Sequence, residues 1–214
     1  MKKNSLKEKI ILFIKDSLDT ILFVVVMLIA IKFFIGEIRW IPSGSMHPTL
    51  LEGDRVFVER YSRFYRQPQR GDILIFYPPM VNLQTRPDKV LKRITGFLCK
   101  DMAFIKRVIG MPGDKIEIRK NEDGSSVVLV NDKELNEKYI QSKYEYNDCM
   151  PNMYCGPFIV PEDSYFMMGD NRGNSQDSRY WGFLPKERII GRAVFLMWPF
   201  KRSKVFKKPK YNKI

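Results

Sequence analysis

The sequence predicts a mostly β protein, in which an N-terminal transmembrane helix precedes an antiparallel, barrel-like sheet domain with a small β excursion. Residues Thr20–Ile35 are apolar except for Thr20 and Lys32, and no second apolar run of this length follows. Beyond residue 36, apolar and polar residues alternate over short runs, as in Lys115–Arg119, and turn sequences separate these runs. No long helical period is found there, which favours β structure.

The apolar stretch is interpreted as an uncleaved signal anchor over residues 18–36, because starting at Leu18 makes it long enough to span a bilayer. A cleaved signal peptide would need a small-residue exit site, and Gly36–Trp40 does not offer one. A buried core helix is rarely apolar on all faces. The basic N-terminus, residues 1–17, is expected in the cytoplasm and the rest of the chain outside the cytoplasmic (inner) membrane.

The outer domain is expected over residues 37–200, with an inserted excursion at about residues 119–160. Short helical turns are expected near Thr49 and Pro185. The expected strands are residues 54–59, 72–77, 102–108, 115–119, 126–130, 164–168 and 190–198.

The charge indicates an anionic partner surface. The formal net charge of +13 over 214 residues suits lipid headgroups or nucleic acid. Much of it lies in the basic tail, residues 201–214, which we interpret as a solvated, partly disordered end. Contact with anionic headgroups is the alternative. Nucleic-acid binding is disfavoured because no recognition motif accompanies the charge.

The three cysteines are Cys99, Cys149 and Cys155. The spacing of Cys149 and Cys155 permits a small disulfide loop in an oxidising compartment, which would leave Cys99 as a free thiol. A zinc site is less favoured, since the single histidine, His47, is far away in the sequence.

Ser45 is the first candidate for chemistry, within Ile41-Pro-Ser-Gly-Ser-Met-His-Pro-Thr-Leu50. Pro42 and Gly44 favour a turn that exposes Oγ and leaves nearby amides free to bind an oxyanion. A serine nucleophile needs a base, and His47, two residues away, is badly placed to act as one.

Lys106 is the second candidate, because it lies within the apolar run Met102–Ile109. Burial there would lower its pKa from the usual value of about 10.4 and make it a possible base. The alternative is that Lys106 points outward while its apolar neighbours point inward, and the sequence alone does not decide between the two.

A third segment, Gly169-Asp-Asn-Arg-Gly-Asn-Ser-Gln-Asp-Ser-Arg179, is dense in short polar side chains that satisfy one another in tight turns. Its acidic residues do not have EF-hand spacing, and it lacks the glycine-lysine pattern of a phosphate loop. A polar brace beside an active site is the better interpretation.

Together these segments resemble bacterial type I signal peptidases, the membrane-bound Ser-Lys endopeptidases. The resemblance rests on Ser43–Leu50, Ile105–Asp114 and Gly169–Arg179, in this order behind an N-terminal span, with Arg70–Phe76 as a weaker match. It covers the anchor and essentially the whole outer domain. The sequence departs from the family in showing one span where some members have two, in its small excursion, and in Arg39 near the expected substrate cleft.

The resemblance implies a role for each matching residue. Ser45 would be the nucleophile and Lys106 the general base. The hydroxyl of Ser43 would complete an oxyanion hole with the Ser45 amide, and Ser175 would hydrogen-bond the lysine. Supporting ion pairs are implied among Asp170, Asp177, Arg107 and Arg179. Some family members carry a cysteine pair in the excursion, which supports a Cys149–Cys155 bridge.

The implied activity is removal of signal peptides from exported preproteins at the outer membrane face, after small residues at positions −1 and −3. The substrate would dock as a strand between Ile38–Pro42 and Met102–Lys106. No metal or cofactor is expected, and the enzyme would be monomeric, bound to the phospholipid bilayer and not to nucleic acid. The expected walls of the substrate pockets are Ile41, Pro42, Met46, Leu50, Phe104 and Ile105.

Three other classes remain as rivals. Another Ser-Lys protease, such as a self-cleaving repressor-type fold, is disfavoured by the anchor. A peptidase dedicated to one export or conjugation substrate needs a substrate panel to exclude. A non-catalytic, membrane-tethered β domain would tolerate a broken serine-lysine pair, whereas Ser45 and Lys106 are both present.

Overall fold

The computed structural model describes residues 6–83, 102–142 and 155–211. The chain divides into two compact units, which are described separately. One contains Met1–Ile35 and Gln84–Cys99, and the other contains Gly36–Leu83 and Lys100–Ile214.

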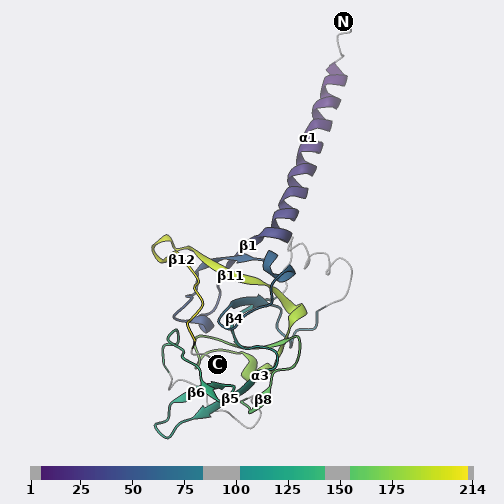
Figure 1. Ribbon diagram of the computed structural model, residues 1–214. Coiled ribbons are helices and arrows are strands. Elements are labelled where there is room, and N and C mark those ends of the chain that lie inside the picture. Colours follow the sequence, from purple (N-terminus) through teal and green to yellow (C-terminus); the bar gives the residue numbers. More distant parts are fainter. Residues whose placement is uncertain (1–5, 84–101, 143–154, 212–214) are drawn as a thin grey trace. The chain divides into compact units, whose positions relative to one another are not determined.

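The described part of the first unit is one helix, α1 (Leu6–Ala30), which continues as the π-helical turn η1 (Ile31–Ile35) (Figure 1). It is long and apolar enough to cross a membrane, and no residue of its most apolar window is buried. The helix begins at Leu6, well before the expected anchor boundary at Leu18. Because the residues before Leu18 are mostly good helix formers, the helical pattern continues through them.

The second unit is built on an antiparallel sheet in which β12 pairs with β11 beside the main strand path. Its strand order is β1 (Gly36–Trp40), β2 (Arg55–Glu59), β11 (Ile189–Trp198), β3 (Ile73–Phe76), β4 (Phe104–Gly110), β9 (Ser164–Met168) and β10 (Leu184–Pro185), with β12 at Lys204–Val205. Each expected strand is present within two residues of its expected bounds. The strands β1, β10 and β12 were not expected, and β10 and β12 have only two residues each, too few to show a period.

A smaller antiparallel sheet forms the excursion. Its order is β7 (Lys133–Glu134), β6 (Ser126–Val130), β5 (Lys115–Lys120) and β8 (Phe158–Ile159), and Figure 1 shows β5, β6 and β8 together. The short helices are η2 (Gly44–Met46), η3 (Tyr61–Phe64), α3 (Ser178–Trp181), η4 (Lys186–Arg188) and η5 (Phe200–Arg202). The turn expected near Pro185 is η4. The turn expected near Thr49 is instead η2, which begins at Gly44.

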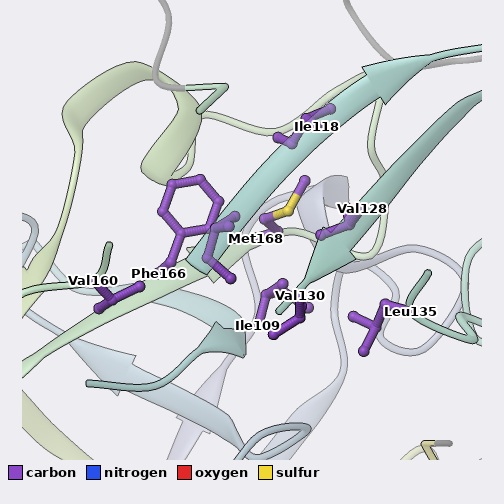
Figure 2. Packing of buried hydrophobic residues seen from close by; sticks show 9 residues of the cluster. Ile109, Ile118, Val128, Val130, Leu135, Val160, Phe166 and Met168 are labelled. Carbon is purple, nitrogen blue, oxygen red and sulfur yellow. The ribbon is translucent and has the colours of Figure 1, made fainter. Parts of the chain in front are cut away.

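One hydrophobic cluster joins the two sheets, and Figure 2 shows its packing. From β4 and β9 come Ile109, Phe166 and Met168. From β5 and β6 come the branched residues Ile116, Ile118, Val128 and Val130. Burial of each such side chain contributes about 1.5–3 kcal/mol, so the excursion is packed against the main sheet through a shared core.

The opposite faces of β4 and β9 are buried as well. Val108 and Met167 belong to a second cluster, while their chain neighbours Ile109 and Met168 belong to the first. Because side chains alternate between the two faces of a strand, neither face is left to solvent here. The position of Lys106 on β4 is therefore buried, which excludes the outward-pointing alternative.

The backbone of the basic tail contacts the domain, although its described lysines are exposed, as expected for a solvated end. Lys204 and Val205 pair with β11, and Arg202 Nη1 lies 2.7 Å from the buried carboxylate of Asp54. Two extended residues among lysines are too short to show a strand pattern, so the sequence did not reveal this contact.

Candidate active site

Ser45 lies in the short helix η2, which begins directly after Ser43, a residue with an extended backbone conformation. Its backbone carbonyl accepts a hydrogen bond from the Asn171 amide at 3.1 Å, and Asn171 Nδ2 donates to the Gly44 carbonyl at 3.0 Å. The turn that carries Ser45 is thereby fixed to the loop after β9.

The side chain of Lys106 reaches Ser45 from the neighbouring strand β4. Its Nζ lies 2.8 Å from Ser45 Oγ and donates a second hydrogen bond to the Ile105 carbonyl at 3.0 Å. The exposed fractions of Lys106 and Ser45 are 4% and 8%. The two candidates are therefore in direct contact in a nearly closed environment, with the Phe104 ring 5.2 Å from the ammonium.

Burial lowers the pKa of Lys106 from 10.5 to about 8. The charges of Asp177 and Asp170 act in the opposite direction and raise it, whereas that of Arg179 lowers it. A substantial fraction of the amine is therefore neutral near neutral pH. A neutral Nζ at this distance can accept the hydrogen that the Ser45 hydroxyl donates.

Asp177 and Arg179 form a fully buried ion pair. Arg179 Nε and Nη2 lie 2.8 Å and 2.9 Å from the two carboxylate oxygens, and the Gly169 amide donates to Asp177 Oδ2 at 3.0 Å. Burial by itself would raise the pKa of Asp177, but the charge and hydrogen bonds of Arg179, with the Gly169 amide, lower it. The carboxylate is therefore ionised near Lys106.

A second buried pair joins Arg107, the residue after Lys106, to Asp170. Arg107 Nε and Nη2 lie 2.8 Å and 2.6 Å from the two oxygens of Asp170, and the Thr49 hydroxyl donates to Oδ2 at 2.5 Å. The three segments with the serine, the lysine and the polar brace are thus joined by one charged network.

Gly169 permits the close approach of these segments. A Cβ on this residue would lie 2.5 Å from the Ser45 carbonyl oxygen and 2.2 Å from Ser175 Oγ. Both distances are shorter than any van der Waals contact, so a larger residue would displace the serine turn.

Ser175 does not make the hydrogen bond to Lys106 that the resemblance implies. Its Oγ is buried and has no hydrogen-bond partner among the described residues. It lies close enough to Asp177 to help lower the pKa of that carboxyl group. The hydroxyl faces the Asp177 side of the site, while Lys106 Nζ is already bonded to Ser45 Oγ and the Ile105 carbonyl.

The expected pocket walls divide into two groups. Met46 and Leu50 have exposed fractions of 0%, and Ile41 is also buried, so these three side chains lie in the core of this structure. Pro42 is exposed, Phe104 is half-buried and Ile105 is slightly accessible. Ser43, the expected oxyanion donor, is exposed next to Ser45.

The remaining predictions concern the cysteines and metals. Cys155 is in a disulfide, but Cys149 lies outside the described residues, so the pairing of these two stays a prediction. Within the described ranges, no group of three potential metal-ligating side chains comes together. His47 Nε2 is buried and lacks a hydrogen-bond partner among those residues, so no described group orients it as a base.

Sequence reasoning missed several supporting residues. Thr49 and Asn171 lie inside the sequence motifs quoted above, and this position was the signal that could have identified them. The buried pair between Glu137 and Arg172 had none, because Glu137 lies in a segment that reads as irregular. Tyr139 also belongs to this network, since its hydroxyl donates to Glu137 at 2.8 Å and its ring lies 4.1 Å from the Arg107 guanidinium.

Comparison with known proteins identifies relatives of this chain. Residues 14–198 match the family described as signal peptidase, peptidase S26. Signal peptidase I of Leptolyngbya laminosa is 41% identical over 187 residues, covering 87% of this chain and 81% of that protein. A probable signal peptidase I-2 of Synechocystis is also 41% identical over 187 residues, with coverages of 86% and 72%.

A solved signal peptidase I from Enterococcus faecalis is 27% identical, covers 60% of this chain and 98% of its own, and has a TM-score of 0.41. The family match covers most of the chain, and the sequence relatives exceed 40% identity over most of both lengths. This chain belongs to the signal peptidase I family of S26 peptidases.

Proposed function

We propose that this enzyme removes N-terminal signal peptides from exported preproteins, with Ser45 as the nucleophile and Lys106 as the general base. The observation that carries the proposal is the 2.8 Å contact between Ser45 Oγ and a buried lysine amine whose pKa is lowered to about 8. The proposed substrate class, preproteins with signal peptides, is inferred from the names of the relatives of this chain, which are signal peptidases.

In the proposed reaction, neutral Lys106 takes the proton of the Ser45 hydroxyl as Oγ attacks the scissile carbonyl. The protonated amine then gives this proton to the leaving amine, and an acyl-enzyme remains. Lys106, neutral again, activates the water that hydrolyses the ester. The Ser45 amide and the Ser43 hydroxyl would stabilise the oxyanion, at about 3 kcal/mol for each donor.

The strand pairing leaves room for an extended substrate. On β4, Phe104 and Ile105 pair with β3, whereas β9 pairs only from Arg107 onward. Within the described residues, the β9 side of Phe104–Ile105 therefore has no strand partner. A peptide added along this edge would pass Ser45 and place alternate side chains against the same wall.

This alternation is the basis of the proposed specificity. The side chains one and three residues before the cut would face the same side, and the core residues behind this wall, such as Met46, are closed to solvent. A shallow wall would accept small side chains at both positions. The helix α1 would anchor the enzyme in the cytoplasmic membrane, with its N-terminus inside and the β unit outside.

Cleavage is expected to require small residues at positions −1 and −3. The full chain in vesicles should cut a labelled preprotein with alanine at both positions, and leucine at either one should lower kcat/KM by about 100-fold or more, because the side chain has no pocket. Sequencing of the product N-terminus checks the position of the cut. Equal cleavage of both substrates would contradict the proposed wall, and a panel of unrelated preproteins would separate a general from a dedicated peptidase.

The activity should also report the titration of Lys106. Because its pKa is lowered to about 8, roughly one amine in ten is neutral at pH 7, against about one in 3000 at the ordinary pKa. We expect kcat/KM to rise about tenfold per pH unit below pH 8 and to level off above it. A profile that stays flat from about pH 6 to 10 would exclude a lysine base.

A further inference from the structure

Two sizeable cavities lie away from the contact between Ser45 and Lys106. The first, of about 530 Å³, contains Arg66, Lys186 and Arg192, each of which is paired with a carboxylate. The second, of about 490 Å³, contains five cationic residues and no acidic one among its described lining residues. We call the second one the basic cavity.

The lysines of the basic cavity are Lys138 from the excursion and Lys204, Lys207 and Lys210 from the tail. No described residue forms an ion pair with any of them. Arg107, the fifth cation, is already neutralised by Asp170. Four ammonium groups around one cavity repel one another, so an anion that binds all of them would remove this repulsion and gain their attraction.

The tail backbone is held on the domain, which keeps three of these lysines beside the cavity while their side chains are exposed. Phe206 N donates to the Val194 carbonyl at 2.9 Å, and Lys208, which does not line the cavity, pairs with Asp72. Tyr211 packs closely over Gly71, where a Cβ would lie 3.1 Å from its ring. Because the tail backbone is already held, binding here loses less backbone entropy than binding by a free polybasic tail does.

Other polar and apolar groups complete the lining. Asn136 offers an amide, and Phe206 and Pro209 offer apolar contact, whereas the hydrogen of the Thr49 hydroxyl is already donated to Asp170. Lysine is a point-charge donor suited to phosphate oxygens. We propose that the basic cavity binds a phosphate-bearing anion, with Lys138, Lys204, Lys207 and Lys210 as its ligands. The four lysine ligands take no part in the proposed peptidase chemistry, although Arg107 and Thr49 of the charged network also line this cavity.

Lysine footprinting on the full chain in neutral-detergent micelles tests the proposal. Limited acetylation is followed by mass spectrometry without additive, with inorganic phosphate, and with phosphatidylglycerol or phosphatidylcholine in the micelles. At twice the Kd, acetylation of the four cavity lysines should slow by about threefold. Lys201, an exposed lysine of the same tail outside the cavity, should be unaffected.

A pair of double variants supplies the matched control. Lys138→Gln/Lys207→Gln should weaken the binding of the protecting anion by at least about tenfold. Lys201→Gln/Lys186→Gln, with the same change of net charge, should weaken it by less than about twofold. Protection by inorganic phosphate assigns the site to phosphate itself, and protection only by phosphatidylglycerol assigns it to a lipid headgroup. No protection, equal protection of Lys201, or equal effects of the two variants would overturn the proposal.

Discussion

Lys106→Met is expected to reduce cleavage of a preprotein by at least about 1000-fold, because it removes the proposed base while keeping a side chain of similar length in the same place. Ser45→Ala should have an effect at least as large, since it removes the nucleophile. Two groups that act as a unit are not additive, so the double variant should be about as inactive as either single variant.

The same Lys106→Met change is expected to stabilise the fold. The pKa of Lys106 is about 8 in the folded protein, against 10.5 as the ordinary value. Below pH 8 both states hold the proton, so the folded state bears the full cost of the buried charge, on the order of 3 kcal/mol. This cost falls as the pH rises from about 8 to 10.5, where only the unfolded state remains protonated. Methionine avoids it at all pH values.

Initial rates and urea unfolding at pH 7 measure both effects on the same protein. Lys115→Met is the control, because Lys115 pairs with Asp132 at the surface and should change neither property by much. A Lys106→Met variant that is inactive but less stable would indicate a structural role for the lysine. One that still cleaves the preprotein at the wild-type rate would remove the lysine from the mechanism.

The serine and lysine were predictable because each carries a local signal. Ser45 lies in a turn built by proline and glycine, and Lys106 interrupts an apolar run. The sequence left the direction of the lysine open, because one strand does not reveal whether both of its faces are covered. One face of β4 is covered by the excursion, and the face that holds Val108 packs with residues such as Phe76 and Met167, which lie far away in the sequence. The pairing Arg107–Asp170 depends in the same way on strands that meet only in the fold.

The expected substrate walls show where a local pattern misleads. Met46 and Leu50 follow the nucleophile and are apolar, so they read equally well as pocket or as core. The structure places both side chains in the core, with exposed fractions of 0%. The sequence also did not reveal how the tail is attached: its described lysines are exposed, as expected, but a two-residue strand and the ion pair Arg202–Asp54 attach it to the domain.

Asp177→Asn is expected to destabilise the fold by about 3–5 kcal/mol, because it leaves the Arg179 guanidinium buried without a counter-ion. Both side chains have exposed fractions of 0%, and the amide of asparagine accepts only at one end. Replacing both residues, as in Asp177→Asn/Arg179→Met, should cost less than the single change, since no unpaired charge remains. Asp132→Asn, which breaks the exposed pair with Lys115, should cost less than about 1 kcal/mol.

The same variant tests the electrostatic control of Lys106. The charge of Asp177 raises the pKa of the lysine, so its removal should lower that pKa below 8 and move the rising part of the activity profile to lower pH. A purely structural role would lower the rate at every pH without displacing the profile. An unchanged midpoint in a folded Asp177→Asn protein would therefore mean that the charge of Asp177 does not set the basicity of the amine, and that this carboxylate serves to hold the loop against Ser45.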